Sequence, residues 1–209
     1  MSASETPPLL YQTHARVHLQ NIRSNIDGIR REVGPELKIL IAVKANAYGH
    51  GAVEVSRMAE DVGVDWLGVA SVPEGIELRN AGITLPILKF SPAFPEEMQA
   101  AVLHDLTLTV CERENIRQLN QIASENNCTR NVHLKVDTGM GRIGVTPEDA
   151  PDLARYIETE CPNLRLDGVF THLPVSDTPD IGYTQKQISF FAKTVEHIQS
   201  AIGRKLSLV

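Results

Sequence analysis

The chain has 209 residues, of which 42% are hydrophobic and 22% charged, and its formal net charge is −6. These values are typical of a globular domain with a sizeable core, and the lack of a basic run disfavours a nucleic-acid surface. The opening residues, MSASETPPLL, lack the basic and apolar regions of a signal peptide, and no stretch has the length of a membrane span. Cys111, Cys128 and Cys161 lack CxxC spacing, which predicts reduced thiols and no metal site. We therefore expect a cytoplasmic protein that binds neither nucleic acid nor membrane.

Strand-like and helix-like segments alternate along the chain after a polar lead over residues 1–13. Residues 15–19 predict a brief strand, and residues 20–32 predict a helix because their isoleucines have helical spacing. Apolar runs then predict strands over residues 39–43, 66–70, 87–90, 106–110, 132–136 and 166–170. Helical patterns follow them over residues 52–62, 74–81, 95–104, 112–126, 147–160 and 184–202.

This alternation predicts an α/β fold with a parallel sheet. Six consecutive βα units without an obvious reversal favour a (β/α)₈ TIM-type barrel over an open doubly wound sheet. Such a barrel needs eight strands, whereas residues 205–209 (KLSLV) look like the start of a seventh, in which the chain stops. A core strand that ends midway leaves backbone groups unpaired. We therefore expect residues 14–209 to form an incomplete barrel domain, the N-terminal part of a longer or truncated protein.

Lys44 follows the first predicted strand of the barrel, within the segment AVKANAYGHG of residues 42–51. The carboxyl ends of barrel strands carry the catalytic groups. A lysine backed by an apolar strand is partly desolvated, which favours the neutral amine that attacks an aldehyde. Gly49 and Gly51 permit a tight turn before the next helix. On composition alone, a solvated surface lysine is the alternative.

Two later segments also place polar side chains at the ends of predicted strands. In HLKVDTGMGRIG, residues 133–144, strand alternation puts His133, Lys135 and Asp137 on one face. Burying that face inside a barrel is costly unless it serves a site, and an exposed edge strand is the alternative. In LDGVFTHLPVSD, residues 166–177, His172 lies at a strand end, although a lone histidine is also common in loops and cores.

Together these three segments resemble the alanine racemase family of fold-type III pyridoxal 5′-phosphate (PLP) enzymes. AVKAN also resembles a run in related decarboxylases, but residues 47–51 (AYGHG) and the DTGMGR run favour the racemases. The resemblance implies a PLP cofactor, a small amino-acid substrate, a homodimer, and interconversion of L- and D-alanine that supplies D-alanine for cell-wall peptidoglycan. It also implies that Lys44 forms the Schiff base with the cofactor and acts as one of two catalytic acid/base groups.

The same resemblance implies roles for five further residues. Tyr48 would lie near the cofactor phosphate, and the ring of His172 would pack on the face of the pyridine. Arg142 would bind the phenolic oxygen of the cofactor and the substrate, which suits a permanently charged guanidinium. Met140 matches a residue whose backbone amide lies near the substrate carboxylate. Lys135 matches a lysine that is often carbamylated and holds the arginine in place.

Parts of the family's machinery have no counterpart in this sequence. The second base of the family is a tyrosine in a C-terminal β-domain of the partner subunit, and none of the four tyrosines here matches it. The family's phosphate cradle follows strands seven and eight. We therefore expect the chain alone to racemise poorly. Leu173-Pro174 replaces the commoner Phe-Ala, which leaves the preference between alanine and serine open.

Three other interpretations remain open at this point. The runner-up is a fold-type III PLP amino-acid decarboxylase, which product analysis would distinguish. The second is a non-catalytic PLP-binding module, a single barrel that stores or delivers the cofactor. The third is a structural fragment that binds no cofactor.

Overall fold

The structure, a computed structural model, describes residues 13–209, so that all of the predicted N-terminal lead except Thr13 lies outside the described residues. Six parallel strands form one sheet whose order follows the chain, β1-β2-β3-β4-β5-β6. The strands are β1 (Leu40–Ala42), β2 (Trp66–Val69), β3 (Ile87–Lys89), β4 (Thr107–Val110), β5 (Arg130–Lys135) and β6 (Leu164–Phe170). This arrangement confirms the predicted fold class, an incomplete (β/α)₈ barrel.

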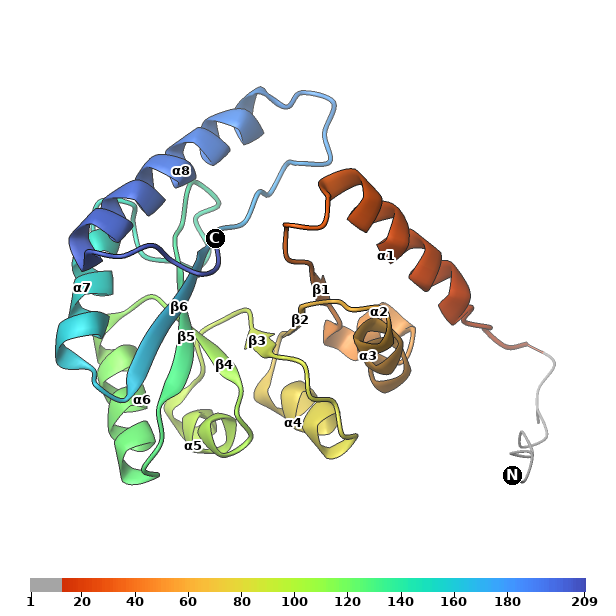
Figure 1. The fold of residues 1–209 in the computed structure, drawn as a ribbon, viewed down its shortest axis with the longest axis horizontal. Coiled ribbons are helices and arrows are strands. Elements are labelled where there is room, and N and C mark those ends of the chain that lie inside the picture. Colours follow the sequence, from red (N-terminus) through yellow and green to blue (C-terminus); the bar gives the residue numbers. More distant parts are fainter. Residues whose placement is uncertain (1–12) are drawn as a thin grey trace.

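Helices cover the outer side of the curved sheet, while β1 and β6 form its two edges on opposite sides of the centre (Figure 1). The helices are α1 (Leu19–Val33), α2 (Lys44–Gly49), α3 (Ala52–Asp61), α4 (Val72–Asn80), α5 (Pro95–Leu103), α6 (Arg113–Glu125), α7 (Ala150–Glu160) and α8 (Gly182–Ile202). Each helix from α3 to α7 follows one strand and leads to the next, as the sequence predicts. The main apolar core therefore lies between the sheet and these helices, with Leu67, Ile87 and Leu134 fully buried in it.

Two segments at the ends of the described chain differ from simple strands. The predicted strand over residues 15–19 is wrong, because residues 13–18 pair with no neighbouring strand and α1 begins at Leu19. At the other end, Leu208 alone forms a parallel bridge to Gly168, and its carbonyl accepts a hydrogen bond from the Val169 amide at 3.1 Å. Residues 205–209 therefore make the first contact of a seventh parallel strand beside β6.

Glycines on the inner face of the sheet make room for large rings. A Cβ atom at Gly68 would overlap the ring of Phe90, and one at Gly168 would lie 2.8 Å from the ring of His133. Gly168 is the register partner of His133 on the neighbouring strand. Alternating small and large residues in this way fills the inside of a barrel.

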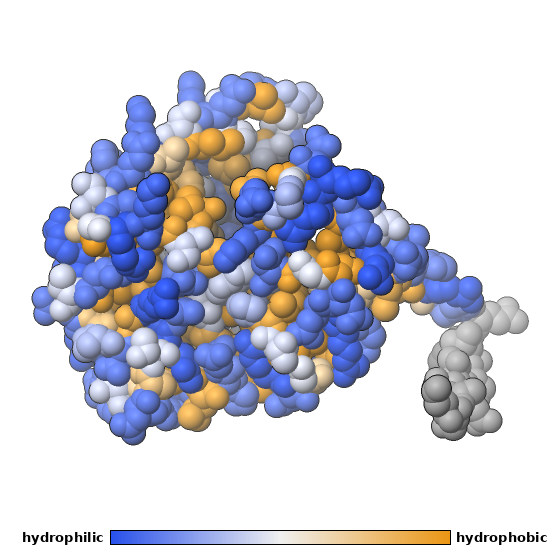
Figure 2. Space-filling view, viewed as in Figure 1, coloured by the Kyte–Doolittle hydropathy of each residue, from blue (hydrophilic) through white to orange (hydrophobic). Residues whose placement is uncertain are grey.

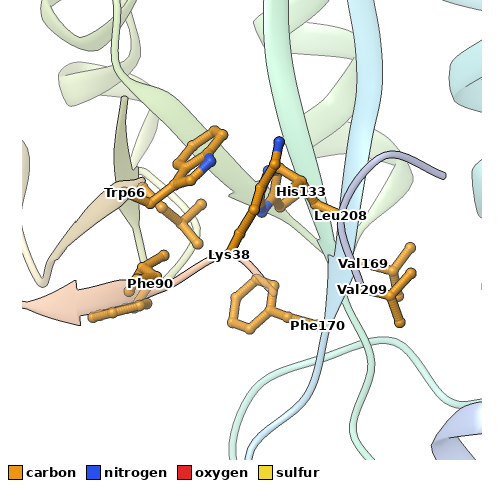
Figure 3. Close-up of a pocket in the computed structure, with 10 residues that line it drawn as sticks. Lys38, Trp66, Phe90, His133, Val169, Phe170, Leu208 and Val209 are labelled. Atoms are coloured by element: carbon orange, nitrogen blue, oxygen red, sulfur yellow. The ribbon is translucent and has the colours of Figure 1, made fainter. Parts of the chain in front are cut away.

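The inner face lines a largely apolar, partly open cavity of about 260 Å³. Side chains from β1, β2, β3, β5 and β6 converge on it, and Lys38, Trp66 and His133 lie together along one side (Figure 3). The space-filling view shows the surface hollowed between the β6–α8 side and the β1–α1 side, with apolar residues around the hollow (Figure 2). Phe90 and Phe170 close this cavity toward the carboxyl ends of the strands, where a second cavity begins.

Candidate active site

The second cavity lies at the carboxyl ends of β1, β3, β5 and β6 and has a volume of about 260 Å³. Its lining includes the cationic side chains of Lys44, Lys135 and Arg142 but no carboxylate. The other lining residues are Ala42, Tyr48, Phe90, Phe170, Thr171 and His172. A cavity with this charge and these aromatic walls is suited to an anionic ligand that contains a flat ring.

Lys44 enters the cavity from an unusual turn at the end of β1. The four residues after it, Ala45 to Tyr48, have φ between 51° and 55° and ψ between 40° and 49°, which is the left-handed helical region. None of the four is a glycine, and this conformation costs an L-residue about 1–2 kcal/mol each. Backbone strain of this kind persists only when surrounding contacts determine it, and it is frequent at functional sites.

Several hydrogen bonds hold the left-handed turn. The Ala47 amide donates to the Val43 carbonyl at 2.8 Å, and the Asn46 side chain accepts from the Ala52 amide at 2.8 Å. The His50 ring nitrogen Nδ1 lies 2.9 Å from the Ala47 carbonyl, so that this histidine helps to shape the turn. Within the turn, the Lys44 ammonium lies 5.9 Å from the centroid of the Tyr48 ring, at the mouth of the cavity.

Arg142 is carried by a loop that the carboxylate of Asp137 organises from within. Asp137 accepts hydrogen bonds from the amides of Gly139 at 2.9 Å, Met140 at 2.8 Å and Arg142 at 3.2 Å. Burial opposes ionisation of Asp137, but these hydrogen bonds lower its pKa overall. From α8, the Tyr183 hydroxyl donates to the Gly139 carbonyl at 3.0 Å. The loop is therefore fixed on both sides, with its guanidinium directed to the cavity.

Lys135 is a buried cation between these groups. Its side chain is 4% exposed, and its ammonium lies 4.8 Å from the centroid of the Phe170 ring. The ammonium forms no ion pair among residues 13–209. Burial, followed by the neighbouring Arg142 charge, lowers the pKa of Lys135. A lysine in this position is more easily deprotonated than an exposed one.

His172 completes the cavity wall beyond the end of β6. Burial lowers its pKa below 6.5, and the charges of Arg142, Lys135 and Lys44 lower it further. The lowered pKa favours the neutral imidazole at pH 7, because a proton there would be poorly solvated and would lie beside other cationic side chains. A neutral ring is suited to pack against another aromatic ring.

The structure brings together most of the residues singled out in the sequence. Lys44, Tyr48, Lys135, Arg142 and His172 all line one cavity. Met140 is not among the residues that line it, and its backbone amide donates a hydrogen bond to Asp137. The sequence did not point to Phe90 or Thr171, whose only signal was a place at or just beyond the end of a predicted strand.

Two other kinds of site find no support in the described part of the chain. No group of three or more His, Cys, Asp or Glu side chains among residues 13–209 is placed to hold a metal ion. None of the described helices is both long and apolar enough to cross a membrane.

Comparison with known proteins identifies relatives of this chain. The profile of the family described as "Alanine racemase, N-terminal domain" matches residues 17–208. The chain is 44% identical over 193 residues to an alanine racemase of Cutibacterium acnes, covering 91% of this chain and 51% of that protein. It is 44% identical over 192 residues to an alanine racemase of Treponema denticola, covering 90% and 50% of the two chains. The chain thus spans about half the length of these curated relatives.

Solved structures agree with the sequence relatives. An alanine racemase of Clostridium difficile 630 in complex with cycloserine superimposes with a TM-score of 0.88 at 36% identity, covering 92% of this chain and 52% of that one. An alanine racemase of Bacillus anthracis with bound L-Ala-P gives a TM-score of 0.83 at 31% identity, covering 92% and 50%. Fold, profile and relatives therefore agree that the chain belongs to the alanine racemase family, whose N-terminal domain it carries.

Proposed function

We propose that this chain is the cofactor-binding part of a PLP-dependent alanine racemase, which interconverts L- and D-alanine. The observation that carries the proposal is the convergence of Lys44, Lys135, Arg142 and His172 on one cavity at the carboxyl ends of the strands. The relatives over this stretch are named alanine racemases, which supports the same reaction and disfavours a decarboxylase.

The donor set fits PLP. A cationic cavity without a carboxylate suits the phosphate and the phenolic oxygen, and Phe90 and Phe170 offer apolar walls for the ring. Lys44 would hold the cofactor covalently through Nζ, because a strand-terminal lysine amine reaches the cavity. Bound there, the cofactor would supply an electron sink that makes the α-proton of an amino acid acidic.

The protein residues would then bind the substrate and move its proton. Lys44 would take or return the α-proton on one face of the substrate through Nζ. Arg142 would bind the substrate carboxylate and the phenolic oxygen with its fixed set of donors. Tyr48 would lie near the phosphate, and the neutral ring of His172 would pack on the pyridine. We also propose that the Met140 amide binds near the substrate carboxylate, for which it would have to leave Asp137.

Lys135 would act on Arg142 rather than on the substrate. We propose that its amine is carbamylated, which would replace a buried cation beside a guanidinium with an anion that pairs with it. Such a pair would hold Arg142 from the interior of the barrel while Asp137 holds its backbone.

Racemisation needs a second acid/base group on the opposite face of the substrate. We propose that it lies outside this chain, in a part that corresponds to the other half of the relatives, and that the partner subunit of a homodimer presents it. We further propose a cytoplasmic enzyme whose product serves cell-wall peptidoglycan.

Titration with PLP tests the first step of this proposal. The chain is expected to gain visible absorbance with PLP, and borohydride followed by peptide mapping should place the reduced adduct on Lys44. Lys44→Ala should abolish the adduct, whereas the control Lys38→Ala, at the neighbouring inner cavity, should retain it. An adduct that persists in Lys44→Ala at the wild-type level contradicts the proposal.

Product analysis tests the reaction class. With L-alanine and PLP, any turnover should yield D-alanine and no CO₂, and the chain alone should turn over slowly because it lacks the second base. Release of CO₂ would support the decarboxylase instead. Efficient racemisation by the chain alone would contradict the assignment of the second base to another part of the protein.

A further inference from the structure

We infer that Glu74 is a positioning residue of the proposed active site: its carboxylate holds the left-handed turn of residues 45–48 and thereby fixes the direction in which Lys44 leaves β1. The inference rests on the proposed function only in taking Lys44 as the reactive amine. Nothing in the sequence singles out Glu74, which lies on α4 and follows a different strand.

The Glu74 carboxylate joins three segments that are separate in the sequence. Its Oε1 accepts a hydrogen bond from the Ala45 amide at 2.8 Å. Its Oε2 accepts from the amides of Ala70 at 2.7 Å and Ser71 at 3.1 Å. One side chain therefore connects the turn after β1 to the end of β2 and to the start of α4.

An ionised carboxylate suits this position better than any uncharged side chain. Three amide N–H groups converge on it, and only a carboxylate offers two oxygens with no donor of its own. Hydrogen bonds to a charged acceptor are also shorter and stronger than neutral ones. A glutamine of the same size would direct its NH₂ group at one of these amides, so that at least one amide would lose its acceptor.

The turn needs such an external contact because its own residues do not favour it. Ala45, Ala47 and Tyr48 carry Cβ atoms that disfavour positive φ, and each has a φ near 50°. Ala45 is the first residue of the turn, and its amide is bound by Glu74 rather than by the backbone of the turn. Loss of this bond would release the turn at the point where it leaves Lys44.

A role for Glu74 in capping α4 is present but separate. Ser71 and Glu74 form a capping box, in which the Ser71 hydroxyl accepts from the Glu74 amide at 3.4 Å and Glu74 Oε2 accepts from the Ser71 amide. Oε1 takes no part in this cap, because its partner lies 29 residues earlier in the chain. Ser71→Ala therefore weakens the cap while it leaves the bond between Glu74 and Ala45 in place.

Amide hydrogen exchange on the ligand-free full chain tests the geometric part of the inference. Glu74→Ala and Glu74→Gln should both accelerate exchange in the peptide that spans residues 44–51, by about tenfold or more for Glu74→Ala. Ser71→Ala should accelerate exchange at the start of α4 only, and Glu77→Gln, an exposed carboxylate on the same helix, should change neither segment. Unchanged exchange over residues 44–51 in both Glu74 variants would overturn the inference, as would an equal effect of Ser71→Ala there.

Borohydride trapping of PLP on Lys44 tests the consequence for the reactive amine. At equal folded fractions, confirmed by thermal melts, Glu74→Ala should slow labelling of Lys44 by about tenfold, since misplacing a reacting group is costly. Glu74→Gln should slow it less, and Ser71→Ala should label at the wild-type rate. Wild-type rates in both Glu74 variants would overturn the inference. If wild-type Lys44 acquires no label, the proposed function fails instead, and hydrogen exchange still decides the role of Glu74.

Discussion

The imidazole of His133 lies 5.0 Å from the indole of Trp66, measured between ring centroids. His133 is inside the barrel and only 4% exposed. Its Nε2 is buried without a hydrogen-bond partner among the described residues. Burial lowers the pKa of His133 from 6.5 to about 4, although the charge of Asp167 opposes the shift. Between pH 4 and pH 6.5, His133 is therefore mostly unprotonated in the folded protein, whereas it is mostly protonated in the unfolded chain.

Acid is expected to unfold the protein partly through His133. The pKa of His133 is lower in the folded state than in the unfolded state. The contribution of His133 to the stability is therefore fully present above pH 6.5 and is lost as the pH falls from 6.5 toward 4. The free energy of unfolding should decrease by about 2 kcal/mol from this group between pH 7 and pH 5. Urea unfolding at the two pH values measures it. His133→Leu should remove this component, and an identical pH dependence in the variant would refute the assignment.

Asp137→Ala should loosen the loop that carries Arg142. The variant leaves the amides of Gly139, Met140 and Arg142 without their acceptor, which should cost about 1–3 kcal/mol of unfolding free energy. The pKa of Asp137 is lowered in the folded state. The contribution of Asp137 to the stability is therefore fully present above pH 3.8 and is lost as the pH falls through the pKa of the folded state. Urea titrations measure the loss. Asp27→Ala, an exposed carboxylate on α1, serves as the control and should cost almost nothing.

Carbamylation of Lys135 is expected to be detectable with labelled bicarbonate. The neutral amine attacks CO₂, a C–N bond forms and one proton is released, and burial favours the neutral amine by lowering the pKa of Lys135. A carbamate carbon signal should appear in ¹³C NMR spectra of the protein and should disappear in Lys135→Met. A spectrum that shows the same signal in Lys135→Met would assign the modification to another lysine.

Gly139→Ala should destabilise the same loop by crowding α8. Gly139 has a φ of +133°, and a Cβ atom there would lie 2.5 Å from the Tyr183 hydroxyl oxygen. We expect a loss of about 1–3 kcal/mol from the backbone conformation alone, with the clash in addition. Adding Tyr183→Phe to Gly139→Ala should relieve the clash but leave the backbone cost in place. A double-mutant cycle measures the part of the unfolding free energy that the clash contributes. Additive effects of the two substitutions would argue against this contact.

The alternation of strands and helices could be predicted because the strands are short and mostly apolar, and because helices such as α1, α3 and α6 place their apolar residues at a 3.6-residue period. Apart from the wrongly predicted strand over residues 15–19 and the unpredicted α2, the differences lie at the ends of elements, where tertiary contacts set the boundary. Helix α4 begins at Val72, two residues before the predicted start, because Ser71 and Glu74 cap it. Strand β5 begins at Arg130, not at 132, because Arg130 and Leu164 are register partners on neighbouring strands.

The candidate site was only partly visible in the sequence. Lys44, Arg142 and His172 stand in motifs at strand ends, so their convergence follows once the strands are parallel. The left-handed turn was not visible, since alanine and tyrosine ordinarily avoid that conformation and the contact that supports it comes from Glu74 in another unit. Phe90 gives no local signal beyond its place at the end of a predicted strand, and the position of its ring depends on the space left by Gly68.

The consecutive strand order has a consequence for folding during synthesis. Every hydrogen-bonded neighbour of a strand is the one just before or just after it in the chain. A nascent polypeptide can thus add each new unit to a growing edge as it leaves the ribosome, without waiting for a distant segment to arrive.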